Sequence, residues 1–208
     1  FGVDGAGIKV GLISDSFNPT GSFPSLADQI LAGDLPGAGN PNGYTTPVTV
    51  IQDLPGASDE ARAMLEIVHD LAPGAELYFH SAFSDFSGGA SPGQSIANAI
   101  NALVAQDVDI IFDDAGFLTE PRFQDGVAAQ AVNAAQAAGI AYFAAAGNSA
   151  NDATRHAFNG PAGSTVNFGT NDVLEVNFPG GTRPVIVQWT EPYPTVSGTF
   201  ATADFEVD

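Results

Sequence analysis

Short, nearly continuous apolar runs alternate with longer segments in which apolar residues recur every three or four positions, up to about residue 146. The runs predict buried strands, and the longer spacing predicts amphipathic helices. The predicted strands are residues 8–14, 47–52, 76–82, 108–112 and 140–146. The predicted helices lie within residues 24–32, 58–73, 96–103 and 126–138. This alternation predicts an α/β fold, a doubly wound parallel sheet with helices on both faces.

The pattern changes after about Asn167. Residues 173–178, 184–189 and 200–207 are short alternating segments separated by Gly and Pro, with no helical spacing between them. Such a pattern is typical of antiparallel strands. We therefore expect an α/β domain over residues 1–167, which is incomplete, and the start of a β-rich, sandwich-like inserted module over residues 168–208.

The helix within residues 58–73 has an unusual acidic start. Ser58 is the expected N-cap, and Asp59 and Glu60 follow in the first turn, where negative charge meets the positive end of the helix dipole. A capping box would need an acid three residues after Ser58, but Ala61 stands there. The expected buried stripe of this helix is Met64, Ile67, Val68 and Leu71. Glu60 lies one turn before that stripe, so its carboxylate is expected to point inward.

Several polar residues and a glycine follow the predicted strands directly. In parallel sheets, ligands bind beyond the carboxyl ends of the strands. The residues at these ends are Asp15, Asp113, Asp114, Gly147 and Asn148. We expect Asp15, Glu60 and Asn148 to converge at one edge of the sheet.

The charge balance limits the partners of the protein. The chain has 24 acidic and 5 basic residues, a formal charge of -19, which repels nucleic acid and anionic membranes. No apolar run approaches the roughly 20 residues of a membrane-spanning helix, so no membrane insertion is expected. The chain has no cysteine, which excludes disulfides and thiolate metal sites. It begins at Phe1 without a recognisable signal peptide, and we expect a piece of a longer extracellular or cell-surface protein.

The sequence gives no strong signal for a cofactor. His69, His80 and His156 lack the spacing of a metal site, and His69 is interpreted as structural. The glycines at 5–7 precede the first strand instead of following it, so no phosphate-binding loop is predicted and a nucleotide-binding protein is disfavoured.

Calcium is the one metal ion that the acidic residues of the sequence suggest. Asp113, Asp114 and Glu120 are candidates for calcium binding or for lining a substrate cleft, although acids at strand ends often only meet water. A structural calcium ion is therefore possible, and no other cofactor is expected.

Three segments resemble motifs of the subtilisin-like (subtilase) serine peptidases. VGLISDSF is similar to the segment that carries the catalytic Asp, YFAAAGNSA to the Asn motif, and DEARAMLEIVHDLAPGAEL to the helix that carries the catalytic His. The resemblance covers roughly residues 5–150. It implies that Asp15 and Asn148 are site residues and that Glu60 stands where the family has its His.

The sequence departs from the family pattern at two places. With Glu60 there is no histidine base, and although the related sedolisins use a Glu base with an Asp one turn later, Met64 stands at that position here. The nucleophile motif GTSxA is absent, and Gly163–Thr165 has the wrong order. The Ser nucleophile is therefore expected beyond Asp208, and this chain alone is expected to be inactive.

The chemistry of these residues fits acyl transfer. Glu60 can take a proton from a serine hydroxyl if burial and a neighbouring acid raise its pKa, and Asp15 can share that proton or orient the carboxylate. The Asn148 amide can donate to an oxyanion, a contribution of roughly 3 kcal/mol in such enzymes. We expect a serine endopeptidase domain that acts on a protein or peptide substrate.

Structural interpretations of the same residues stay open. Asp15 can cap a loop, Glu60 can favour the helix dipole, and Asn148 can satisfy a turn. The alternative function is accordingly a catalytically inactive subtilisin-like module for binding or surface adhesion.

Overall fold

A computed structural model describes residues 3–54, 57–84, 88–118 and 120–148 of the chain. The expected β-rich module at 168–208 lies outside these residues, as do His156 and the segment 163–165. In the described ranges, no helix combines the length and the apolar character needed to cross a membrane.

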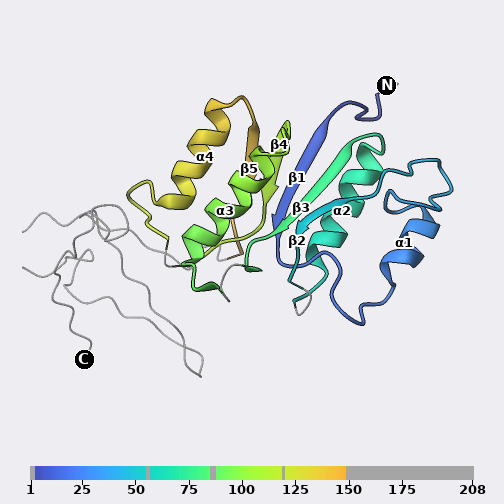
Figure 1. Ribbon diagram of the computed structural model, residues 1–208, viewed down its shortest axis with the longest axis horizontal. Coiled ribbons are helices and arrows are strands. Elements are labelled where there is room, and N and C mark those ends of the chain that lie inside the picture. Colours follow the sequence, from blue (N-terminus) through green and yellow to red (C-terminus); the bar gives the residue numbers. More distant parts are fainter. Residues whose placement is uncertain (1–2, 55–56, 85–87, 119, 149–208) are drawn as a thin grey trace, which may run out of the picture. The chain divides into compact units, whose positions relative to one another are not determined.

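The described part is a parallel five-stranded sheet with helices between the strands, in the order β2-β3-β1-β4-β5 (Figure 1). The strands are β1 (Lys9–Ser14), β2 (Thr49–Gln52), β3 (Glu76–Ser81), β4 (Ile110–Asp113) and β5 (Ala141–Ala144). The helices are α1 (Leu26–Ala32), α2 (Glu60–Leu71), α3 (Pro92–Val104) and α4 (Val127–Ala137). The predicted α/β fold with a parallel sheet is therefore confirmed, and each described element lies within a few residues of its expected position.

Two apolar cores cover the two faces of the sheet. Side chains alternate along β1, so Leu12 packs into the core that contains Leu65 of α2, while Ile13 packs into the core that contains Ile100 of α3. Figure 1 shows α2 and the pair α3 and α4 on opposite sides of the sheet. Helices on both faces explain why β1 and β3 are buried almost throughout.

A glycine lets α3 approach the central strand closely. A Cβ atom added at Gly11 of β1 would lie only 2.9 Å from a terminal methyl carbon of Leu103 in α3. Gly11 therefore helps to fix the distance between α3 and the sheet.

The strand order creates a crevice between β1 and β4. The chain leaves β1 toward β2 at one edge of the sheet, and it leaves β4 toward β5 at the other edge. Adjacent parallel strands whose connections depart in opposite directions leave a gap at their carboxyl ends, where ligands bind. Asp15 follows β1, and Asp114 follows β4.

Two expectations for α2 are wrong. The helix begins at Glu60 with Asp59 as its N-cap, and Ser58 instead donates hydrogen bonds to Asp15. In the expected stripe, Ile67 and Leu71 are 62% and 80% exposed. The buried residues of α2 are Ala61, Arg62, Leu65 and His69.

Two polar residues account for the rotated face of α2. The buried Arg62 guanidinium donates to Asp59 and to the carbonyl of Pro24, while the His69 ring packs edge-on against Tyr44. Met64 and Val68 of the expected stripe do pack against the core, so the buried face is rotated away from Ile67 and Leu71 toward Arg62 and His69.

Candidate active site

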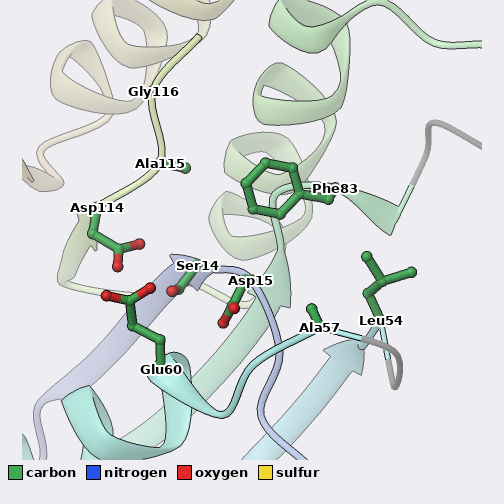
Figure 2. A pocket seen from close by; sticks show the side chains of 9 residues that line it. All are labelled: Ser14, Asp15, Leu54, Ala57, Glu60, Phe83, Asp114, Ala115 and Gly116. Carbon is green, nitrogen blue, oxygen red and sulfur yellow. The ribbon is translucent and has the colours of Figure 1, made fainter. Parts of the chain in front are cut away.

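A pocket of about 530 Å³ opens at the carboxyl ends of β1 and β4 (Figure 2). Its lining residues are Ser14, Asp15, Leu54, Ala57, Glu60, Phe83, Asp114, Ala115 and Gly116. Among them are two of the expected site residues, Asp15 and Glu60, which come from the loop after β1 and from the first residue of α2. None of the lining residues is basic, so the acids of this pocket have no counter-ion within its wall.

The Asp15 carboxylate is held by donors on both oxygens. Oδ2 accepts from the backbone N–H of Ser58 at 3.0 Å and from the Ser58 hydroxyl. Oδ1 accepts from the backbone N–H of Ser16 at 2.5 Å. The Ser81 hydroxyl donates to the Asp15 carbonyl at 2.6 Å, which ties the same residue to the end of β3. Asp15 is thus fixed in position by three neighbouring segments.

Asp53 anchors the chain that follows Asp15. One oxygen of its carboxylate accepts from the Ser16 hydroxyl at 2.8 Å and from the Phe17 N–H at 3.0 Å, and the other accepts from the Asn18 N–H at 3.0 Å. Hydrogen bonds to an ionised group are among the stronger ones in proteins. Asp53 therefore orders the turn that carries Asp15 out of the sheet.

Glu60 is exposed at the start of α2 and does not point into the core as expected, although its side chain lines the pocket. The charge of Asp114 raises its pKa most, followed by burial and then by the charge of Asp15. A raised pKa makes a carboxylate a stronger base once it is ionised. The carboxyl groups of Glu60 and Asp114 point toward one another in Figure 2.

Asp113 and Asp114 are adjacent in the chain, but their side chains lie in different surroundings. Successive side chains at a strand end point to opposite faces. Burial raises the pKa of Asp113, and a hydrogen bond from Tyr142 lowers it by less. Burial also raises the pKa of the Tyr142 hydroxyl, and the charge of Asp113 raises it further. Burial also raises the pKa of Asp114, and the Ser14 hydroxyl lowers it by less. Only Asp114 of the two lines the pocket.

The calcium candidates do not form one cluster. Asp113 meets Tyr142, Asp114 lines the pocket, and the Glu120 carboxylate lies against Gly93 and Gly126. Within the described ranges, no group of three or more His, Cys, Asp or Glu side chains is arranged to hold a metal ion.

The described histidines have structural surroundings. His80 is buried in β3 and its Nδ1 lies 2.8 Å from the Ser81 carbonyl. His69 is buried in α2, and burial lowers its pKa. Neither lines the pocket.

Asn148 lies in an exposed bend after β5, directly behind Gly147, whose φ is 78°. It belongs to a second compact unit, residues 146–187, whereas the pocket belongs to the first. The expected convergence of Asn148 with Asp15 and Glu60 therefore stays a prediction.

Sequence reasoning missed three features of this site: the donation from Ser58 to Asp15, the anchoring by Asp53, and the orientation of Asp114 toward Glu60. The adjacent acids after β4 were recognised as candidates, but for calcium or substrate. The strand order, which puts β4 beside β1, was the missing information.

Comparison with known families gives one match. The model of the subtilase family matches residues 30–187, a range that includes Glu60, Asp114 and Asn148 and begins after Asp15. No curated protein matched the chain.

Proposed function

The chain belongs to the subtilase family, and from that premise we propose that it is part of a serine endopeptidase in which Glu60 replaces the histidine base. The observation that supports this most is the common pocket of Asp15 and Glu60 at the carboxyl end of the sheet. The raised pKa of Glu60, caused first by the charge of Asp114, gives further support.

The proposed reaction is acyl transfer to a serine that lies outside this sequence, because no GTSxA motif occurs in it. The serine oxygen forms a bond to the peptide carbonyl carbon while its proton passes to Glu60. The tetrahedral intermediate then breaks its C–N bond, and Glu60 returns the proton to the leaving amine. Water hydrolyses the resulting ester by the same route, and Glu60 again acts first as base and then as acid.

Asp15 and Asn148 have supporting roles in this proposal. Asp15, held in place by Ser58 and Ser16, raises the pKa of Glu60 and shares its proton or orients its carboxylate. The Asn148 amide donates to the oxyanion of the tetrahedral intermediate. The substrate is a protein or peptide, and the strongly acidic composition suits an extracellular or cell-surface location.

Glu60→Gln in the intact protein tests the proposal. Glutamine keeps the size of the side chain but cannot accept a proton, so peptide hydrolysis should fall by at least about 100-fold. Glu66→Gln is the matched control, since Glu66 lies on the same helix, is partly buried and is not part of the pocket wall.

Both variants should unfold at nearly the wild-type temperature, which separates loss of chemistry from loss of fold. Unchanged hydrolysis by a folded Glu60→Gln protein contradicts the assignment of Glu60 as the base. Absence of hydrolysis by the intact wild-type protein favours the inactive binding or adhesion module, which the absence of the family's histidine also allows.

A further inference from the structure

The two aspartates that flank Glu60 differ in their hydrogen bonds. Asp15 accepts from two backbone N–H groups, of Ser16 and Ser58, and from the Ser58 hydroxyl. These three donors hold the Asp15 side chain in place.

Asp114 has fewer donors around its carboxyl group. Its half-buried side chain lies at the end of β4, and burial is the largest cause of its raised pKa. The Ser14 hydroxyl and the backbone of Asp114 itself act in the opposite direction, and the charge of Asp15 adds to the rise.

We infer that Asp114 is the positioning residue that sets the proton occupancy of Glu60, while Asp15 is held in place by Ser58 and Ser16. The inference rests on the proposed function in one respect, namely that the proton on Glu60 matters for peptide hydrolysis. The two carboxyl groups that face each other in Figure 2 are those of Glu60 and Asp114.

The charges around Glu60 support this assignment. At the carboxyl ends of the strands, the charges that act on Glu60 are those of Asp15 and Asp114. Asp113 is next to Asp114 in the chain, but its carboxyl group accepts a hydrogen bond from Tyr142. On its own helix, Arg62 is paired with Asp59 and is 1% exposed, and it does not line the pocket. Asp114 is the largest cause of the raised pKa of Glu60, ahead of burial and of Asp15.

The Ser14 hydroxyl is a further polar group of this pocket. Ser14 is 1% exposed and lines the pocket, and its hydroxyl lowers the pKa of Asp114, which burial raises. A serine hydroxyl can donate to a carboxylate or accept from a protonated carboxyl group, so Ser14 can serve Asp114 and Glu60 in either protonation state.

The consequence for the reaction concerns which group holds the proton. Two interacting carboxyl groups lose their protons in two steps that belong to the pair. In the singly protonated pair, a proton on Asp114 leaves Glu60 ionised and able to accept the proton of a serine.

A titration of the 208-residue chain tests this inference without any turnover. Carboxyl ¹³C resonances are followed against pH in the wild type, Asp114→Asn and Asp15→Asn, and Glu60→Gln identifies the Glu60 signal. The Glu60 midpoint should fall in Asp114→Asn, and it should fall further than in Asp15→Asn. The Glu66 midpoint, which burial raises elsewhere on α2, should stay unchanged in both and serves as internal reference.

A Glu60 midpoint that stays unchanged in Asp114→Asn, or that shifts more in Asp15→Asn, overturns the inference. Should Asp114→Asn fail to fold, the wild type still decides, because coupled Glu60 and Asp114 resonances must each report both steps. Independent single-step curves for the two residues would also overturn it.

The outcome is separable from that of the proposed function. A coupled titration combined with normal hydrolysis by Glu60→Gln would contradict the catalytic role and leave the proton pair intact. Independent titration of Glu60 and Asp114, combined with loss of hydrolysis in Glu60→Gln, would support the catalytic role of Glu60 and contradict the proton pair.

Discussion

The ends of β1 and β4 each present an aspartate to one pocket, yet the two strand ends are built differently. At β1, a network of Ser16, Asp53 and Ser58 surrounds Asp15 with donors and fixes it. At β4, Asp114 is half-buried, and burial raises its pKa. The comparison teaches that equivalent positions in a parallel sheet give a carboxyl group held in place by several donors in one case and a half-buried group with a raised pKa in the other, according to the donors that neighbouring loops supply.

The largest expected effect comes from breaking the β1 network at Asp53. Asp53→Ala leaves the Ser16 hydroxyl and the N–H groups of Phe17 and Asn18 without their acceptor, and should lower the free energy of unfolding by roughly 2 kcal/mol. Chemical denaturation of the chain measures the change. Asp70→Ala, at an exposed position of α2, is the control and should stay within about 0.5 kcal/mol of wild type. Equal effects of the two variants would mean that the anchoring by Asp53 is not stabilising.

A smaller effect on the free energy of unfolding, of opposite sign, is expected when Asp114 at the end of β4 is replaced. The folded protein raises the pKa of Asp114, so it binds a proton there more tightly than the unfolded chain does. Ionisation of Asp114 therefore lowers stability as pH rises above the ordinary carboxyl range. Asp114→Asn should be more stable than wild type at pH 7, and the gain should disappear at a pH below the ordinary carboxyl pKa.

The size of this gain should stay below about 1 kcal/mol, because solvent screens charges around the exposed Glu60. Thermal unfolding at both pH values measures it, with Asp70→Asn as control. A variant that is less stable than wild type at pH 7 would show that Asp114 is a structural anchor like Asp53.

The fold could be predicted from the sequence because its signals are local. Runs such as residues 8–14 and 76–82 have apolar residues at consecutive central positions, and a strand covered on both faces favours that pattern. Asp15 and Glu60 could be assigned to one end of the sheet from their positions directly after a strand and at a helix start.

The remaining features depend on contacts between distant parts of the chain. The sequence predicts Ser58 as an N-cap, but its N–H and hydroxyl donate to the carboxyl group of Asp15, which lies 43 residues earlier in the chain. Arg62 and His69 occupy buried positions of α2, so the apolar stripe predicted the burial of Met64 and Val68 but not the rotation that exposes Ile67 and Leu71. The orientation of Asp114 toward Glu60 follows from the pairing of β1 with β4, which no local pattern specifies.

The most direct measurement of the central claim is the pH dependence of active-site labelling of the intact protein by a serine-directed covalent inhibitor. Because Glu60 must be ionised to accept the serine proton, the labelling rate should rise with pH through a midpoint above the ordinary glutamate pKa. That midpoint should coincide with the midpoint of the Glu60 carboxyl resonance, and Glu60→Gln should remove the dependence together with most of the labelling. A labelling rate in Glu60→Gln that equals the wild-type rate, or a wild-type midpoint that does not match the Glu60 titration, would contradict the account.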